Sequence, residues 1–243
     1  EFLELYNKAT NITDISNKSF DFTIFPIVNL WGFGPDFHTS NLPDSKDIEE
    51  KLKITGTENL ILENGSIRKL NKYTKIDFSA IAKGWGVDKV SLWLEGQNIE
   101  NYMVEIGGEI RVAGKNINNS NWNIGISIPE DVKIDLFKTI NITDIGIATS
   151  GSYNNYFTKD NINYTHLIDP KTGYPIKHDL VSATITASDC ATADGVATAV
   201  MVKGFQEGLN WVNSLPNIEC LLIRKNDEGD YIAGQSSGFN YEH

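Results

Sequence analysis

The segment "TADGVATAVMVKG", residues 192–204, constrains the fold of this chain more than any other. Its pattern predicts a helix with apolar residues around much of its circumference: Val196, Ala197, Val200 and Met201. Such a helix has to be buried. Asp194 and Thr198 nevertheless lie within it, four residues apart. This spacing stacks two side chains on one helical face, one turn apart, so both offer oxygen atoms to the same place.

Two interpretations of Asp194 follow. A solvent-facing aspartate near the first turn would be stabilised by the helix dipole. A buried aspartate is costly unless it is paired or binds a cation. One carboxylate and one hydroxyl are too few for a closed metal cage, but they suit Mg²⁺, which often takes one or two protein ligands together with phosphates and water. Asp194 and Thr198 therefore either cap or hydrogen-bond the helix or hold a cation.

Composition narrows the class of protein. A chain of 243 residues suggests one large domain or two intimate ones. Hydrophobic residues make up 40 % and charged residues 22 %, which is typical of a globular protein. The net charge of −11 argues against a nucleic-acid partner. The two cysteines, Cys190 and Cys220, are interpreted as buried thiols and leave the cellular compartment open.

Hydrophobic periodicity predicts an α+β fold with antiparallel sheet. Regular strand–helix alternation is absent and hairpin-like neighbours are frequent, including one hairpin around Asn64-Gly65. The segments 20–35 and 75–97 are both expected to begin as strands, and the second to become a helix from about Ala80. Further helices are expected at 1–10, 42–56, 192–204 and 205–214, and further strands at 101–115, 121–129, 139–151, 163–170, 180–188 and 218–234.

Glycine and hydroxyl residues interrupt two of these strands. Gly107-Gly108 in "EIGGEI" lacks the dinucleotide-binding pattern and fits either a β-bulge or close backbone packing. It also fits a site where missing side chains make room for a ligand. The "TSGS" run at 149–152 forms either an ordinary turn or a set of backbone N–H groups for a phosphate.

The segment "YTHLIDPKTGYP", residues 164–175, is more informative. Asp169 begins a turn with Pro170 at its second position and Gly173 closing it. His166 is either a strand histidine with one satisfied nitrogen or a general acid or base, because an imidazole titrates near pH ~6.5.

Six segments occur in the order seen in the ApbE family of Mg²⁺-dependent FAD:protein FMN transferases, and together they cover about Phe20 to Gly204. The chain therefore resembles this family. The segments are "DFTIFPIVNLWGFGP", "IDFSAIAKGWGVDKV", "EIGGEI", "IATSGSYNNYF", "THLIDPKTGYPI" and "DCATADGVATAVMVKG".

The resemblance implies a T-fold-like α+β architecture with mixed or antiparallel sheets. It implies one ApbE-like catalytic domain over residues 1–243, without an upstream segment that the family carries. The implied activity is transfer of FMN from FAD to a Thr or Ser hydroxyl of a target protein, with AMP leaving. The implied Mg²⁺ ligands are Asp194, Thr198 and the carbonyl of Ala80. The implied FAD contacts are Phe20, Asp21, Asp77, Lys83 and Ile168, and the implied catalytic residues are His166 and Asp194.

The same resemblance gives expectations for partners and location. The acceptor is expected to be a respiratory or electron-transfer flavoprotein subunit carrying the flavinylated Thr or Ser. The protein is expected outside the cytoplasm as a lipoprotein, associated with the membrane only through an anchor in the upstream segment. Two other functions remain open: an FAD pyrophosphatase that yields FMN and AMP, and a flavin-binding module without turnover.

Overall fold

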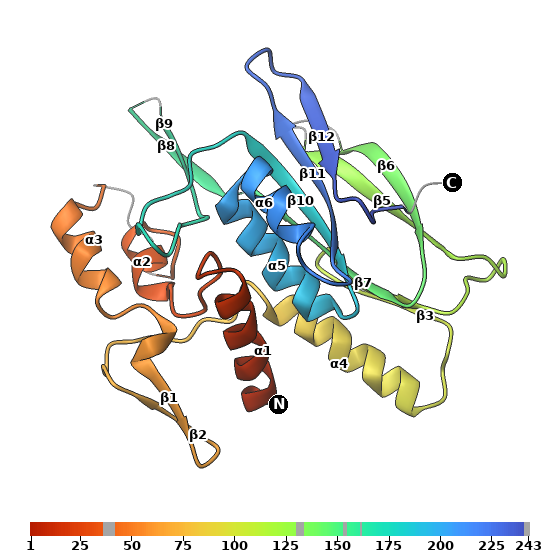
Figure 1. Ribbon diagram of the computed structural model, residues 1–243, viewed down its shortest axis with the longest axis horizontal. Coiled ribbons are helices and arrows are strands. Elements are labelled where there is room, and N and C mark those ends of the chain that lie inside the picture. The colour runs from red at the N-terminus through yellow and green to blue at the C-terminus, as the bar shows by residue number, and fades with distance from the viewer. Residues whose placement is uncertain (36–41, 130–133, 153–154, 161, 241–243) are drawn as a thin grey trace. The chain divides into compact units, whose positions relative to one another are not determined.

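The computed structural model divides the chain into two compact units (Figure 1). The first consists of residues 1–80 and 152–178, and the second of residues 81–151 and 179–243. Each unit therefore combines segments from two distant parts of the sequence. The structure describes residues 1–35, 42–129, 134–152, 155–160 and 162–240.

The second unit is built on a six-stranded antiparallel sheet in the order β12-β11-β10-β7-β4-β3. Its strands are β3 (Tyr102–Ile106), β4 (Glu109–Ala113), β7 (Ile145–Gly151), β10 (Leu180–Ala187), β11 (Glu219–Lys225) and β12 (Tyr231–Gln235). Strand β10 lies inside the sheet between β7 and β11, and almost all of its residues are buried. This burial explains its nearly continuous run of apolar and small residues.

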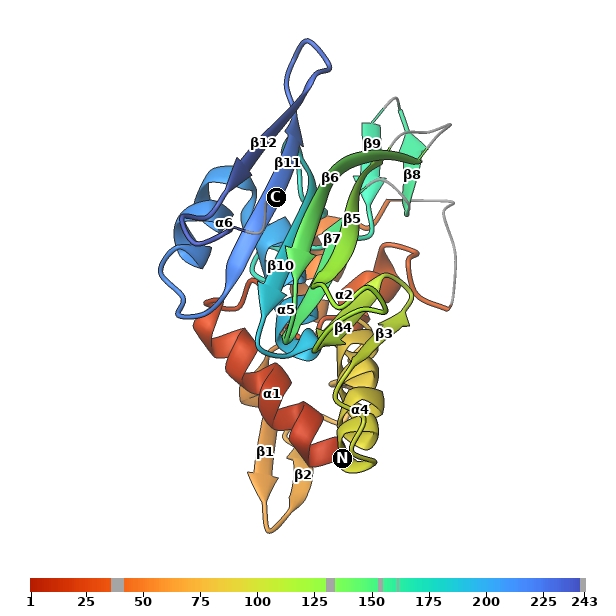
Figure 2. The same cartoon turned by 90° about the vertical axis from the view of Figure 1, so that its right-hand side faces the viewer.

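Both faces of this sheet are covered, by three helices on one face and a β-hairpin on the other (Figures 1 and 2). These elements are α4 (Ala82–Gly96), α5 (Cys190–Lys203), α6 (Phe205–Val212), β5 (Trp122–Pro129) and β6 (Ile134–Ile142). Neighbouring residues of β7 face opposite sides of the sheet. Gly146 meets the start of α5, whereas Ile147 packs with apolar residues of β5 and β6. Helix α5 packs against β7 and β10 of the sheet and against helices α4 and α6, and most of its residues are buried.

The first unit is smaller and depends on an aromatic core. Trp31 stacks on Tyr164 with ring centroids 5.6 Å apart, and its indole N–H donates to the carbonyl of Gly173 at 2.8 Å. Ile27, Ile48 and other apolar residues pack around this pair. The elements of the unit are α1 (Phe2–Ile15), α2 (Phe25–Leu30), α3 (Ser45–Leu52), the 3₁₀ turn η1 (Thr57–Asn59), β1 (Leu60–Glu63), β2 (Ser66–Lys69), β8 (Tyr156–Lys159) and β9 (Ile162–Thr165).

The predicted α+β class with antiparallel sheets is confirmed. The hairpin around Asn64-Gly65 is confirmed as well, and both turn residues have the positive φ that this sequence favours. No helix among the described residues combines the length and the apolar character that a bilayer-spanning helix requires.

Three predicted strands need correction. Residues 20–24 form turns, and Pro26 lies in the first turn of helix α2, where a missing N–H costs no helical hydrogen bond. Residues 75–79 form no strand either. The predicted strand at 139–151 is two strands, the end of β6 and β7, separated by a turn in which Asp144 has a φ of 54°. Apolar composition was the signal in these segments, and it does not distinguish a strand from other buried structure.

Candidate functional site

Helix α5 is fixed tightly at its beginning within the second unit. Asp189 caps it by accepting hydrogen bonds from the Thr192 N–H and hydroxyl at 2.8 and 2.9 Å. Gly84 on α4 and Gly146 on β7 both face the backbone of Cys190, and a Cβ atom at either position would overlap that backbone. Glycine at these two positions therefore lets helix α5 approach both neighbours closely.

Asp194 is buried on this helix, with a relative exposure of 4 %. The N–H of Gly84 donates to its Oδ2 at 3.0 Å, and within the described part of the chain its Oδ1 accepts no hydrogen bond. Burial raises the pKa of the carboxyl to about 6, against the lowering effect of the Gly84 N–H. The solvent-facing interpretation of Asp194 is therefore wrong, and one of its oxygens remains available.

Thr198 lies one turn further along α5 and is half-buried. A threonine inside a helix commonly donates to the carbonyl four residues earlier. Here the hydroxyl forms no hydrogen bond with any described residue. The described residues contain no group of three or more His, Cys, Asp or Glu side chains that could hold a metal ion. Two hard oxygens without a closed cage fit Mg²⁺, which keeps water and substrate ligands.

Lys83 and Glu109 form an ion pair beside Asp194. The Lys83 Nζ lies 2.5 Å from Glu109 Oε2 and 3.4 Å from the carbonyl of Gly107. The Glu109 side chain is only 3 % exposed, and burial raises its pKa while Lys83 opposes that rise. Glu109 also raises the pKa of Asp194, and Lys83 lowers it, which places the three charges in one neighbourhood.

Glu109 was not among the residues predicted from the sequence. It follows Gly107-Gly108, which is the two-residue turn between β3 and β4, with φ values of 60° and 96°. The turn accounts for both glycines by backbone conformation. A charged residue directly after such a turn, at an inward-facing strand position, is the signal that could have identified Glu109.

Asp88 on α4 was also missed. Its carboxylate accepts hydrogen bonds from the backbone N–H groups of Cys190 and Ala191, both at 2.9 Å, and from Arg111 at 3.1 Å. It therefore binds the start of helix α5. The available signal was position: Asp88 lies one turn after Gly84 on the buried face of α4, which also contains Val87.

Three of the predicted FAD contacts lie in the first unit: Phe20, Asp21 and Asp77. Phe20 is buried, with a relative exposure of 2 %. The Asp21 carboxylate accepts hydrogen bonds from the Thr23 N–H and hydroxyl at 2.7 and 2.6 Å, and burial raises its pKa. The Asp77 N–H donates to the carbonyl of Phe22 at 2.7 Å, so the structure brings these two distant segments together.

His166 is half-buried in the first unit, and its Nδ1 lies 3.0 Å from the carbonyl oxygen of Asn155. Because a carbonyl only accepts, Nδ1 carries the proton and Nε2 carries the lone pair. Burial lowers the pKa of the imidazole, which favours the neutral ring. The buried Ile168 forms a β-bridge with Pro175 across the turn that Asp169 organises.

The predicted site residues thus divide between the two units. Lys83, Asp194 and Thr198 belong to the second unit, where the first two share one electrostatic neighbourhood. Ala80 is the last residue of the first unit before the chain enters the second. The first unit holds Phe20, Asp21, Asp77, Ala80, His166 and Ile168. Their assigned roles remain predictions.

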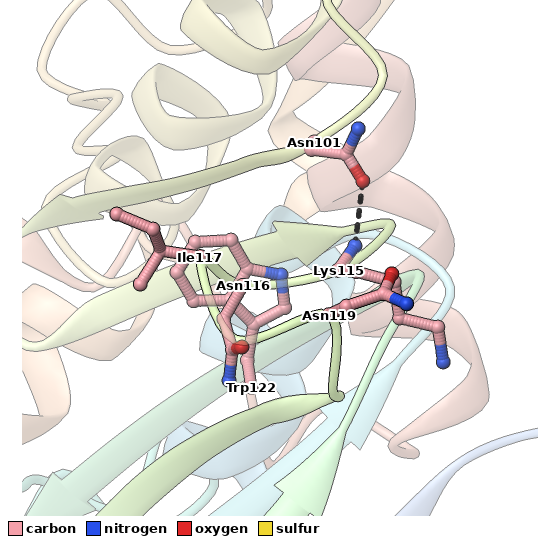
Figure 3. Close-up of a pocket in the computed structure, with 6 residues that line it drawn as sticks. All are labelled: Asn101, Lys115, Asn116, Ile117, Asn119 and Trp122. Carbon is pink, nitrogen blue, oxygen red and sulfur yellow. Dashed lines mark hydrogen bonds between the residues drawn. The ribbon is translucent and has the colours of Figure 1, made fainter.

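The second unit also has a surface pocket of about 450 Å³ beside β5 (Figure 3). Its lining residues are Asn101, Lys115, Asn116, Ile117, Asn119 and Trp122. The Lys115 N–H donates to the Asn101 side chain at 2.7 Å, so part of the polar lining is already paired. None of the predicted site residues lines this pocket, and it is not the candidate site.

Comparison with known proteins decides the family. Residues 1–222 match the ApbE family. The chain belongs to this family. An FAD:protein FMN transferase of Vibrio cholerae is 42 % identical over 227 residues, which cover 93 % of this chain and 68 % of that protein. A protein of the same name from Haemophilus influenzae is 37 % identical, over 98 % of this chain and 70 % of the relative.

Solved structures agree with the sequence relatives. The flavin transferase ApbE from Vibrio cholerae matches with a TM-score of 0.87 at 40 % identity, covering 98 % of this chain and 75 % of that one. The apo form of the Pseudomonas stutzeri flavinyl transferase ApbE matches with a TM-score of 0.88 at 32 % identity, covering 98 % and 73 %. The family, the α+β fold and the transferase class predicted from the sequence are confirmed.

Proposed function

We propose that this ApbE-family chain transfers FMN from FAD to a Thr or Ser hydroxyl of an acceptor protein and releases AMP, in a reaction that requires Mg²⁺. Its relatives are named FAD:protein FMN transferases, which supports FAD as the flavin donor and a protein as the acceptor. The observation that carries the proposal is the buried Asp194 on α5, with one oxygen open, beside the unengaged hydroxyl of Thr198.

The proposed step is a displacement at phosphorus. The acceptor hydroxyl oxygen forms a bond to the phosphorus on the FMN side of the FAD pyrophosphate. The bond from that phosphorus to the bridging oxygen breaks, and AMP leaves with the bridging oxygen and the electron pair. The hydroxyl proton passes to a base. Catalysis of such a step depends mainly on positioning and on stabilising the charge of the phosphates.

The donor set on α5 fits Mg²⁺. Asp194 offers a carboxylate oxygen and Thr198 a hydroxyl oxygen, both hard ligands that no described residue occupies. The carbonyl of Ala80 is the proposed third protein ligand, supported by the family resemblance. When bound, Mg²⁺ would neutralise the pyrophosphate charge and favour departure of AMP. Lys83, whose side chain is 47 % exposed, adds positive charge to the same neighbourhood.

His166 is the proposed base, and its hydrogen bond to Asn155 supports this role because it leaves Nε2 as the acceptor. We propose that Phe20, Asp21, Asp77, Lys83 and Ile168 contact FAD. For His166→Gln we expect turnover to fall by roughly 10²–10⁴-fold while FAD and Mg²⁺ binding persist. Pre-steady-state transfer measured beside FAD titrations checks this, and unchanged turnover removes His166 from the mechanism.

The acceptor is proposed to be a respiratory or electron-transfer flavoprotein subunit that is met outside the cytoplasm. The family resemblance supports this proposal. Protease added to cells whose plasma membrane is intact and accessible should cleave the protein if it faces outward. Protection of the protein until that membrane is opened contradicts an extracytoplasmic location.

The deciding experiment mixes the protein with FAD, Mg²⁺ and a Thr-containing acceptor peptide, and follows the products by mass spectrometry. We expect the peptide to gain one FMN group while AMP appears in equal amount. The control peptide carries Val in place of the acceptor Thr and should remain unlabelled. Free FMN without peptide labelling indicates a pyrophosphatase instead. FAD that stays intact indicates a flavin-binding module.

A further inference from the structure

Helices α4 and α5 are joined by two carboxylates, one from each helix, and each accepts backbone hydrogen bonds from the other helix. Asp88 on α4 accepts hydrogen bonds from the first backbone N–H groups of α5. Asp194 on α5 accepts one from the first turn of α4, at Gly84. The two helices pack against each other, and in Figure 1 the start of α5 lies beside the start of α4. Each helix therefore provides an acceptor for the N-terminal N–H groups of the other.

The contact between these helices has little freedom to shift. A helix leaves its first N–H groups without intrahelical partners, and Asp88 satisfies those of Cys190 and Ala191. Gly84 has no Cβ, and a Cβ there would overlap the carbonyl oxygen of Cys190. Asp194 follows Cys190 by about one helical turn, roughly 6 Å along the axis. A displacement of the start of α5 therefore moves Asp194 by a similar amount.

Asp88 also belongs to a polar network that includes Arg111, Glu95 and Tyr102. Arg111 bridges Asp88 and Glu95, at 3.1 and 3.2 Å. The Tyr102 hydroxyl donates to the same Glu95 oxygen at 2.5 Å. No described atom of α5 bonds to Glu95. Glu95 thus belongs to the same network without a hydrogen bond to α5, which makes it a matched control for Asp88.

We propose that Asp88 is a positioning residue: it fixes the start of α5 so that the open oxygens of Asp194 and Thr198 are already arranged for Mg²⁺. The inference rests on the proposed function, because it assigns Asp88 a role toward the metal site on α5. Asp88 does not contact that site. It acts through the helix that carries it, in the way that outer partners orient the ligands of other metal sites.

The experiment measures Mg²⁺ affinity by calorimetry and the Mg²⁺ dependence of FMN transfer. It compares the parent with Asp88→Asn, Asp88→Ala, Glu95→Gln and Asp194→Ala. For the Asp88 variants we expect Mg²⁺ affinity to fall by roughly 10–100-fold, the range seen when outer-shell partners are removed. Excess Mg²⁺ should restore their turnover. For Glu95→Gln we expect Mg²⁺ affinity close to that of the parent.

Other outcomes contradict the proposal. Parental Mg²⁺ affinity in Asp88→Asn overturns it, even if the variant melts earlier, because a lower melting temperature alone shows only a structural role. Asp88→Asn keeps one acceptor oxygen for α5, so it decides the matter if Asp88→Ala does not fold. An equal loss of Mg²⁺ affinity in Glu95→Gln also overturns it. Asp194→Ala separates the two proposals: if this variant keeps parental Mg²⁺ affinity, the metal site itself is wrongly assigned.

Discussion

Asp88 and Asp194 are both buried aspartates on the packed helices α4 and α5, yet their surroundings differ. Asp88 accepts three hydrogen bonds, two from backbone N–H groups of α5 and one from Arg111. Asp194 accepts one, from Gly84, and its second oxygen has no hydrogen-bond partner among the described residues. Burial raises the pKa of both carboxyls. The two differ in how completely their charge is satisfied.

This difference is the one that we expect between a structural carboxylate and a metal ligand. A buried carboxylate whose oxygens are hydrogen-bonded stabilises the elements that it joins. A buried carboxylate with an open oxygen is costly to ionise unless a cation completes its surroundings. The comparison therefore predicts that Asp88 contributes to stability and Asp194 contributes to function at the expense of stability. Substitutions at both residues can test this directly.

The largest expected effect is on turnover in Asp194→Ala. We expect Mg²⁺-dependent FMN transfer to fall by roughly a thousandfold, about 4 kcal/mol of transition-state stabilisation. The reason is loss of the only carboxylate in the proposed ligand set. Transfer rates at saturating FAD, with circular dichroism to confirm folding, provide the measurement. Residual turnover above a tenth of the parental rate breaks the comparison, because Asp194 would then be no more a ligand than Asp88.

The next largest effect is on stability: Asp194→Asn and Asp88→Asn are expected to change the free energy of unfolding in opposite directions. In EDTA at pH 8, we expect Asp194→Asn to raise the free energy of unfolding by up to about 3 kcal/mol, because it removes a buried charge while keeping an acceptor for Gly84. We expect Asp88→Asn to lower that free energy by about 1–3 kcal/mol, since a satisfied acceptor is lost. Urea unfolding of both variants gives the values, and shifts of the same sign contradict the account.

The stabilisation of Asp194→Asn should depend on pH with a defined sign. The pKa of Asp194 is raised from 3.8 to about 6 in the folded protein. The folded state therefore holds the proton more tightly, and the parental protein loses stability as pH rises from about 4 to about 6. Above about pH 7 the loss is complete and constant. The difference between variant and parent should vanish near about pH 3.5 and grow to its plateau above about pH 7.

The affinity for Mg²⁺ should rise with pH as Asp194 ionises, over the same pH range in which the stability of the parent falls. A protonated Asp194 cannot serve as a ligand, so affinity is expected to fall by about tenfold for each pH unit below about 6. Calorimetry between pH 5 and 8 gives the profile. A flat profile in that range indicates that another group binds the ion.

The smallest effect is expected for Thr198→Val, which removes the hydroxyl and nearly conserves volume. We expect Mg²⁺ affinity to fall by roughly tenfold or less, because a neutral hydroxyl contributes less than a carboxylate. Thr10→Val on helix α1 serves as a control, because its hydroxyl is engaged with the carbonyl of Tyr6 and it lies outside α5. Equal losses in the two variants contradict a specific role for Thr198.

How far the sequence predicted this site depends on the range of each interaction. The shared face of Asp194 and Thr198 follows from helical spacing, which is local, and the resemblance then supplied a role. Asp88 and Glu109 were missed because their partners are distant in sequence. The bond from Cys190 to Asp88 spans 102 residues, and the one between Lys83 and Glu109 spans 26. Composition and periodicity carry no information about such pairings.

The two false strands at 20–25 and 75–79 have a related cause. Both were predicted from apolar residues, and the structure uses those residues in turns, a short helix and irregular backbone. Only the tertiary context shows that the Asp77 N–H bonds to the Phe22 carbonyl instead of to a neighbouring strand. The hairpin turn at Asn64-Gly65 was predicted because Asn-Gly favours positive φ wherever it occurs. Gly107-Gly108 was interpreted as a β-bulge, close packing or room for a ligand, whereas the structure makes it the turn of a second hairpin.

The central claim is that the open oxygen of Asp194 binds the divalent ion that serves FAD cleavage. The most direct test is a crystal of the protein grown with FAD and Mn²⁺, in which anomalous scattering locates the ion. The account predicts a Mn²⁺ peak within bonding distance of Asp194 Oδ1, the Thr198 hydroxyl and the Ala80 carbonyl, with FAD phosphate oxygens among the remaining ligands. A fully occupied Mn²⁺ site elsewhere, with the Asp194 carboxylate bonded only to Gly84, contradicts it.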